Sequence, residues 1–253
     1  MTSSDVVVYL RRLLNIKKVG HTGTLDPGAA GVLPICVGKA TRLSNFIMDQ
    51  TKLYRCEMVL GIETDTFDSY GKVVSVSNKY PGFDIIKQVF NEFQGNIKQY
   101  PPMYSAIKHE GKKLYELARQ GKKVEVLPRD IKILKSTILR YTPPNKILFE
   151  VECSKGTYVR ALCRDMGQRM GCGGHMGFLL RCRTGKFNLN DSYTIDEVEQ
   201  YKHTGDLDKI LIPMDKAVET LEKIILPPQL YKRVIHGNLT KLNYQSITLQ
   251  NLK

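Results

Sequence analysis

Residues 20 to 31 read Gly20-His21-Thr22-Gly23-Thr24-Leu25-Asp26-Pro27-Gly28-Ala29-Ala30-Gly31. This stretch holds one histidine, one carboxylate and four glycines within twelve residues. Glycine lets a backbone approach a ligand closely and adopt angles that side chains forbid. Taken alone, Asp26 before Pro27 is typical of a turn, because proline disfavours helical angles in its predecessor. The alternative is a carboxylate that performs chemistry on a polyanion, and the stretch alone leaves both interpretations open.

The chain around this stretch is strongly basic. Its 253 residues carry 38 Lys and Arg against 25 Asp and Glu, a formal net charge of +13. Such an excess favours nucleic acid as the partner, with an anionic membrane surface as the rival. No apolar run approaches the roughly 18 residues that a spanning helix needs, and the N-terminal segment lacks a signal-peptide pattern. We therefore expect a globular protein that acts in the cytoplasm.

The cysteines show no pattern of metal ligands or disulfides. They contain no Cys-x-x-Cys pair, and their spacing matches no common zinc motif. Buried free thiols are therefore the favoured interpretation, and we predict no metal site. The six residues are Cys36, Cys56, Cys153, Cys163, Cys172 and Cys182.

Helix and strand signals interleave along the chain. Apolar residues at helical spacing predict a helix that starts at Ser3 and further helices over residues 39–49, 83–93, 114–120 and 156–170. Alternating or β-branched runs predict strands over residues 53–60, 73–76, 131–140, 147–153 and 178–187. Hairpin signals, such as Glu110-Gly111, outnumber strand-helix-strand units. We therefore predict an α+β fold with a mixed, mainly antiparallel sheet flanked by helices.

Positive charge is concentrated between Lys98 and Lys135. This segment has ten Lys and Arg against four Asp and Glu, with three tyrosines interleaved. Basic residues neutralise phosphates, and aromatic rings stack on exposed bases. A solvated, lysine-rich surface hairpin is the alternative. The stiff, apolar run Pro101-Pro102-Met103-Tyr104 tips the balance toward RNA.

Seven motifs occur together, and their order and spacing resemble those of the TruB family of tRNA pseudouridine synthases. A single such motif would be weak evidence for the resemblance, whereas seven motifs in order over roughly residues 1–226 are specific evidence for it. The motifs are Gly20–Pro27, Leu33–Thr41, Lys52–Arg55, the acidic run Thr64–Gly71, Pro101–Ala106, Gly111–Glu116 and Cys153–Arg160. The resemblance implies a pseudouridine synthase fold.

The resemblance also implies a reaction. The uridine at position 55 in the T loop of tRNA is converted to pseudouridine: the base is detached from its ribose, turned and rejoined through carbon. This isomerisation needs no redox cofactor, metal or nucleoside triphosphate, so we predict that the chain uses no cofactor. The sequence agrees, because it has no P-loop, Rossmann fingerprint or zinc spacing.

The two charged residues of the implied site are Asp26 and Arg160. Asp26 matches the catalytic aspartate of the family, which acts as nucleophile or as general base. Arg160 matches the arginine that pairs with it, although an isolated arginine in this context is more typical of a surface ion pair. A paired guanidinium would keep the carboxylate ionised in a dry pocket and fix its direction.

The other implied site residues contact the substrate base. Tyr54 matches a tyrosine that stacks on the target uracil and takes the proton from its carbon, and Leu179 aligns with an apolar residue on the other side. The target nucleotide must be flipped out of the T loop. His21 matches the residue that fills the vacated space. Tyr158 is the remaining predicted substrate contact.

We expect tRNA, through its T arm, to be the partner of a monomeric protein with no membrane contact. Residues 98–129 resemble an insertion that grips this arm. The basic side chains predicted to contact RNA are Lys17, Lys18, Arg42, Lys108, Lys112, Lys113 and Arg119.

The predicted domain division is a catalytic domain over residues 1–226 and a short tail over residues 227–253. Compared with the family pattern, the chain lacks the first strand, with its Asp-Lys-Pro segment, and a C-terminal RNA-binding PUA domain. One alternative function is a non-catalytic protein that binds or folds tRNA. Another is a synthase directed by a guide RNA and partner proteins, which the short chain without a basic tail disfavours.

Overall fold

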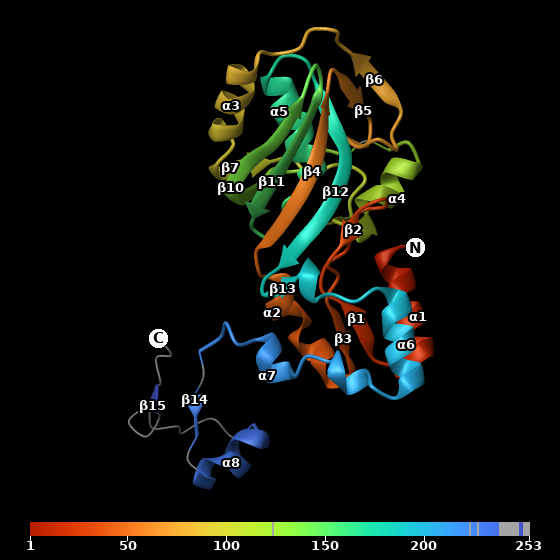
Figure 1. Cartoon of the computed structure of the whole chain (residues 1–253), viewed down its shortest axis with the longest axis vertical. Coiled ribbons are helices and arrows are strands. Elements are labelled where there is room, and N and C mark those ends of the chain that lie inside the picture. The colour runs from red at the N-terminus through yellow and green to blue at the C-terminus, as the bar shows by residue number, and fades with distance from the viewer. Residues whose placement is uncertain (123, 223, 227, 238–247, 250–253) are drawn as a thin grey trace. The chain divides into compact units, whose positions relative to one another are not determined.

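The computed structural model describes residues 1–122, 124–222, 224–226, 228–237 and 248–249 (Figure 1). They fall into two compact units, Met1–Ile210 and the described residues from Leu211 onward. The functional division that we predict at residue 226 differs from this packing boundary and stays a prediction. Much of the predicted tail, namely residues 227, 238–247 and 250–253, lies outside the described residues.

A seven-stranded sheet forms the centre of the first unit. Its strand order is β13-β12-β4-β11-β10-β7, and β2 pairs with β12 in parallel, whereas all the other pairs are antiparallel. The prediction of a mainly antiparallel sheet is therefore confirmed. The strands are β2 (Ala30–Gly31), β4 (Lys52–Leu60), β7 (Gly95–Gln99), β10 (Arg129–Thr142), β11 (Lys146–Cys153), β12 (Gly174–Thr184) and β13 (Phe187–Asn188).

The main core forms because one face of this sheet is apolar. In β11, Ile147, Phe149 and Val151 are completely buried and alternate with half-buried residues. The helices α3 (Phe83–Glu92) and α5 (Val159–Arg169) cover this face (Figure 1). The Phe90 ring of α3 meets the Phe149 ring edge-on, with 5.1 Å between their centroids. The buried residues of α5 belong to the same core, which fixes α5, and with it Arg160, against the sheet.

A second apolar cluster supports the beginning of the glycine-rich stretch. Helix α1 (Ser3–Leu14) begins at a capping box formed by Thr2 and Asp5. Its buried Val7 and Leu10 pack with Val19 of β1 (Val19–His21). Strand β1 pairs with β3 (Ile35–Val37), and Val198 of α6 (Ile195–Thr204) completes the cluster. The first residues of the glycine-rich stretch therefore belong to strand β1, which packs against helix α1.

The remaining elements of the first unit connect these layers. They are η1 (Gly38–Leu43), α2 (Ser44–Met48), β5 (Ile62–Thr64), β6 (Val73–Val76), β8 (Lys108–His109), β9 (Lys112–Lys113), α4 (Leu114–Arg119), η2 (Leu189–Asp191) and η3 (Leu207–Lys209). The second unit contains α7 (Met214–Ala217), β14 (Ile224–Ile225), α8 (Pro228–Ile235) and β15 (Thr248–Leu249). None of the helices in the described part of the chain is long and apolar enough to cross a membrane.

Two local predictions were wrong. The helix expected over residues 39–49 is divided into η1 and α2, because the hydroxyls of Thr41 and Ser44 donate to carbonyls three residues back and favour tight turns. The strand expected over residues 178–187 begins earlier, at Gly174, and is interrupted by a turn after Thr184. The turn contains Gly185, whose φ of 55° lies in the left-handed region that glycine tolerates.

Candidate active site

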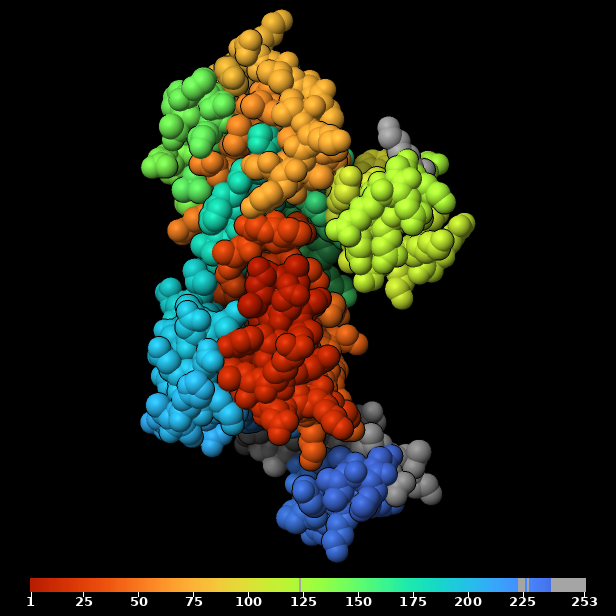
Figure 2. Space-filling model, turned by 90° about the vertical axis from the view of Figure 1, so that its right-hand side faces the viewer, coloured from red at the N-terminus to blue at the C-terminus, as the bar shows by residue number. Residues whose placement is uncertain are grey.

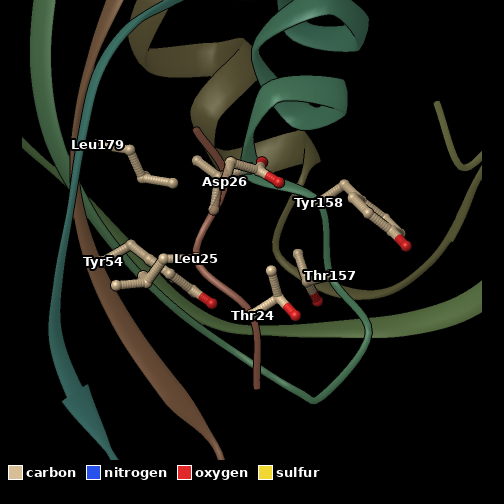
Figure 3. A pocket seen from close by; sticks show the side chains of 8 residues that line it. Thr24, Leu25, Asp26, Tyr54, Thr157, Tyr158 and Leu179 are labelled. Carbon is tan, nitrogen blue, oxygen red and sulfur yellow. The ribbon is translucent and has the colours of Figure 1, made fainter. Parts of the chain in front are cut away.

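The glycine-rich stretch, β4, β12 and the start of α5 meet around one pocket. Figure 3 shows Leu179 reaching in from β12 and Tyr54 from β4 on one side of Asp26, with Tyr158 on the other side. The structure thus brings together four predicted site residues, Asp26, Tyr54, Tyr158 and Leu179, from separate parts of the sequence. The pocket is lined by Thr24, Leu25, Asp26, Tyr54, Thr157, Tyr158, Val159 and Leu179.

The segment that carries Asp26 is held against β12. It leaves β1, turns at Asp26 and returns as β2, where Ala30 and Gly31 pair with Leu180 and Arg181. Gly31 has a φ of +110°, and a Cβ there would lie 2.2 Å from the Arg181 carbonyl oxygen. Only glycine fits this contact, so this glycine brings the backbone onto the strand rather than onto a ligand.

Arg160 lies directly beside the Asp26 carboxylate. Its Nε is 3.2 Å from Asp26 Oδ2, and its Nη2 is 3.5 Å from Oδ1. The arginine side chain is almost fully buried. The same guanidinium donates hydrogen bonds to the carbonyl oxygens of Tyr104 at 2.5 Å and Thr66 at 3.4 Å. Arg160 therefore joins the carboxylate to two further segments of the chain.

Asp68 is a second carboxylate at this guanidinium, and sequence reasoning assigned it no role. Its Oδ2 lies 3.6 Å from Arg160 Nη1, and the residue is buried. Its Oδ1 accepts hydrogen bonds from the Thr66 hydroxyl at 2.6 Å and the Tyr70 amide at 3.0 Å. In the sequence, Asp68 stands out only by its place in the acidic motif Thr64–Gly71. The residues around it in the sequence do not indicate that it faces Arg160.

Electrostatics in the pocket raise the pKa of the Asp26 carboxyl above its ordinary value. Burial is the main cause, and the charge of Asp68 acts in the same direction. The positive charges of Arg160 and Arg181 lower this pKa but do not outweigh burial. Arg160 thus acts in the direction that we expected, within a site whose net effect is to disfavour the charged carboxylate.

The two tyrosines of the pocket are also affected by burial. Burial raises the pKa of the Tyr54 hydroxyl to about 12, so this group is protonated at neutral pH. Burial raises the pKa of Tyr158 as well. The buried Gln99 side chain accepts from the Tyr158 amide at 2.8 Å and donates to its carbonyl at 3.1 Å. Gln99, which the sequence did not single out, therefore positions the residue that precedes α5.

His21 lies at the end of β1 and is not part of the pocket lining. Its Nδ1 accepts a hydrogen bond from the Gly23 amide at 3.3 Å. Burial and the charge of Arg181 lower the pKa of its imidazole. The ring is therefore biased toward its neutral form, which suits a residue that contacts bases rather than phosphates.

The predicted RNA-contacting residues lie mostly at the surface of two regions. Lys17 and Lys18 are exposed between α1 and β1, and Arg42 is exposed in η1. Gln99 of β7 pairs with Arg129 of β10, so the residues between them leave and re-enter the sheet at one place. Figure 2 shows this excursion, in yellow-green, projecting beside the red N-terminal segment. Within it, Lys108, Lys112 and Arg119 are exposed and Lys113 is half-buried.

The cysteines and acidic residues do not gather into a metal site in the described part of the chain. No group of three or more His, Cys, Asp or Glu residues there could hold a metal ion. All six cysteines are free; five are buried, and Cys182 is half-buried.

Comparison with known proteins identifies the family. The family model described as TruB family pseudouridylate synthase (N terminal domain) matches residues 11–159. The one described as tRNA pseudouridylate synthase B C-terminal domain matches residues 160–219. The chain is 48% identical over 244 residues to tRNA pseudouridine synthase B of Alkaliphilus oremlandii, an alignment that covers 96% of this chain and 80% of the relative. With the enzyme of the same name from Clostridioides difficile it shares 44% identity over 240 residues, covering 94% and 79%.

Solved structures show the same architecture. A Cbf5-Nop10-Gar1 complex contains a chain that matches with a TM-score of 0.73 and 31% identity. An H/ACA RNP bound to a substrate RNA containing 2'-deoxyuridine contains one that matches with a TM-score of 0.72 and 29% identity. Each alignment covers 94% of this chain, which spans only 64% and 63% of the respective neighbours. Together, the domain matches, the sequence identities and the shared fold show that this chain belongs to the TruB family of pseudouridylate synthases.

Proposed function

We propose that this chain converts the T-loop uridine at position 55 of tRNA to pseudouridine, with Asp26 as the catalytic carboxylate. Family membership and the name shared by its relatives, tRNA pseudouridine synthase B, support this function. The observation that carries the proposal is the ion pair between the half-buried Asp26 and the buried Arg160, beside a pocket with Tyr54 in its wall. A carboxylate held this way is suited to a reaction at a sugar or base.

The reaction breaks the bond between C1′ of the ribose and N1 of uracil and forms a bond from C1′ to C5. The proton on C5 is released, and N1 gains a proton, so the net change is an isomerisation. Asp26 acts in its ionised form, as nucleophile or as general base. Tyr54 and Leu179 supply apolar surface against which the flipped base packs.

The contacts with the rest of the tRNA follow from the exposed basic residues. The side chains of Lys17, Lys18 and Arg42 contact phosphates, and those on the excursion between β7 and β10 grip the T arm. His21 occupies the space that the flipped nucleotide leaves. The protein acts as a monomer in the cytoplasm.

The proposed function is tested with the purified chain and an unmodified T-arm stem-loop that carries tritium at C5 of the target uridine. Loss of the C5 proton should release tritium into water with multiple turnovers. A stem-loop with cytidine at that position is the matched control. Binding of the stem-loop without tritium release would favour the non-catalytic alternative. Release that requires an added guide RNA would favour the guide-directed one.

Tyr54→Phe is expected to lower the rate of pseudouridine formation by about 100-fold, because it keeps the ring and removes the hydroxyl available for proton transfer. Binding of the stem-loop should be unchanged. Single-turnover kinetics and filter binding measure the two effects. Tyr54→Leu, which also removes the stacking surface, should weaken binding as well. An unchanged rate in Tyr54→Phe would exclude a role for the hydroxyl.

Asp68→Asn is expected to move the acid limb of the pH–rate profile to lower pH. The Asp68 charge raises the pKa of Asp26, so its removal lets Asp26 ionise more easily. The amide keeps an oxygen that accepts from Thr66 and Tyr70. Single-turnover rates across the acidic range measure the shift. A limb that stays in place or moves upward would contradict this coupling.

A further inference from the structure

We propose that Arg181 is a positioning residue of the reaction: it clamps the segment that carries Asp26 onto β12 and places a fixed positive charge behind the catalytic carboxylate. The inference rests on the proposed function, since it concerns the same site. Sequence reasoning did not single out Arg181, and it does not line the pocket.

The clamp consists of hydrogen bonds to both arms of the glycine-rich segment. Arg181 Nε donates to the Val32 carbonyl oxygen at 2.7 Å, after Asp26 in the chain. On the arm before Asp26, its Nη2 donates to the Gly23 carbonyl oxygen at 3.0 Å, and its Nη1 lies 3.5 Å from the Thr24 carbonyl oxygen. One planar guanidinium therefore fixes the distance between the two arms.

Two backbone contacts make this clamp rigid. The Val32 amide donates to the Arg181 carbonyl oxygen at 2.9 Å, and Gly31 packs on the Arg181 backbone. In addition, the Leu25 amide donates to the Ser3 hydroxyl at 2.9 Å. The residue before Asp26 is thus held by α1, while the arms are held by β12.

The charge of Arg181 is unusual for a structural clamp. The residue is 2% exposed, and its hydrogen-bond partners in the described part of the chain are uncharged groups, namely three carbonyl oxygens and the Tyr54 hydroxyl. A buried cation that lacks a carboxylate partner is unfavourable for folding, and neutral donors would satisfy the same carbonyls. The charge has a use at the site because it opposes the effect of burial on Asp26.

The electrostatics of the surroundings agree with this role. The groups that act on Asp26 are Arg160 from α5, Asp68 from the segment between β5 and β6, and Arg181 from β12. The Arg181 charge also lowers the pKa values of His21 and Tyr54. One side chain therefore contacts the catalytic segment and biases three titratable groups of the site.

The test compares Arg181→Met and Arg181→Lys with a control on the same strand, Arg183→Met. Arg183 pairs with Glu152 at 2.7 Å and donates to the Gly185 carbonyl oxygen, away from the clamp. For Arg181→Met we expect kcat on the stem-loop to fall by about 100-fold through misplacement of Asp26, with KM unchanged. The acid limb of its pH–rate profile should move to higher pH. The control should match the wild type in both respects.

Arg181→Lys separates the charge from the forked geometry. It should leave the acid limb at the wild-type position and still lower kcat, because one ammonium cannot bridge the Gly23 and Val32 carbonyls. If Arg181→Met does not fold, this variant decides: wild-type kcat in folded Arg181→Lys would overturn the inference. An Arg181→Met enzyme with the kcat and pH profile of the control would overturn it too.

Amide hydrogen exchange keeps this test independent of the proposed function. The amides of residues 22–32 should exchange faster in the Arg181 variants than in Arg183→Met. Equal exchange would overturn the clamp even if the wild type were inactive. Failure of the wild type to form pseudouridine, with faster exchange in the variants, would instead contradict the proposed function and leave the clamp supported.

Discussion

Asp26→Asn is expected to reduce pseudouridine formation below detection while the chain still binds the T-arm stem-loop. The amide has nearly the shape of the carboxylate but is neither a nucleophile nor a base at neutral pH. Its neighbours Tyr54 and Leu179 are untouched, so the binding surface remains. Tritium release and filter binding on one preparation measure both effects. Turnover close to that of the wild type would refute the catalytic assignment of Asp26.

The same variant should be at least as stable as the wild type at neutral pH. The pKa of Asp26 is raised above 3.8 in the folded state, so ionisation destabilises the fold as pH rises from the unfolded pKa to the folded one. Above the folded-state pKa this free-energy penalty of ionisation is constant. Asp26→Asn does not have the penalty, because its amide does not ionise. The gain in melting temperature should therefore vanish at acidic pH, where the carboxyl is protonated.

Thermal melts over a pH series measure this effect, with Asp49→Asn as the control. Asp49 is exposed and pairs with Lys155 at the surface, so its substitution should change stability little. A lower melting temperature for Asp26→Asn at neutral pH would mean that the ion pair with Arg160 stabilises the fold. That outcome would contradict the raised pKa.

Arg160→Met is expected to produce the second-largest loss, in both stability and activity. It leaves Asp26 and Asp68 facing each other without the cation that lies between them. Removing one partner of a buried ion pair typically destabilises a protein by about 3–5 kcal/mol. The Tyr104 and Thr66 carbonyl oxygens also lose their donor. Denaturant unfolding and single-turnover kinetics measure the two losses.

The pH dependence distinguishes this variant from a simple folding defect. The Arg160 charge lowers the pKa of Asp26, so its removal should move the acid limb of the remaining activity to higher pH. This shift is opposite in sign to the one expected for Asp68→Asn. Arg160→Lys keeps the charge and should retain the wild-type limb, although it loses the forked contacts. A limb unchanged in Arg160→Met would show that Arg160 acts only on stability.

Much of the fold is predictable because its signals are local. The alternation of Ile147, Phe149 and Val151 predicts β11 directly, and every second residue is buried in the structure. The helix over residues 39–49 was predicted wrongly, since apolar spacing there competes with hydroxyls that hydrogen-bond to nearby carbonyls. The extent of β12 depended on pairing with β4 and β2, which leaves no local signal in the sequence.

The residues of the site also fall into two groups, those that sequence motifs reveal and those whose role depends on tertiary contacts. Asp26, Tyr54 and Arg160 were found because each lies in a motif whose order along the chain is specific. Asp68, Gln99 and Arg181 received no role, because an acidic, amide or basic side chain acquires one only from its neighbours in space. Each of these three residues is buried against a segment far away in the sequence.

The amino-acid sequence by itself determined most of the strands and helices, which family the chain resembles and which carboxylate we propose as the catalytic one. Only the tertiary structure decided what the glycine-rich stretch does: it lies on β12, under Arg181, and holds Asp26 beside Arg160. It also decided the raised pKa of Asp26. That value depends on burial and on charges from three separate segments, which packing alone brings within reach of one another.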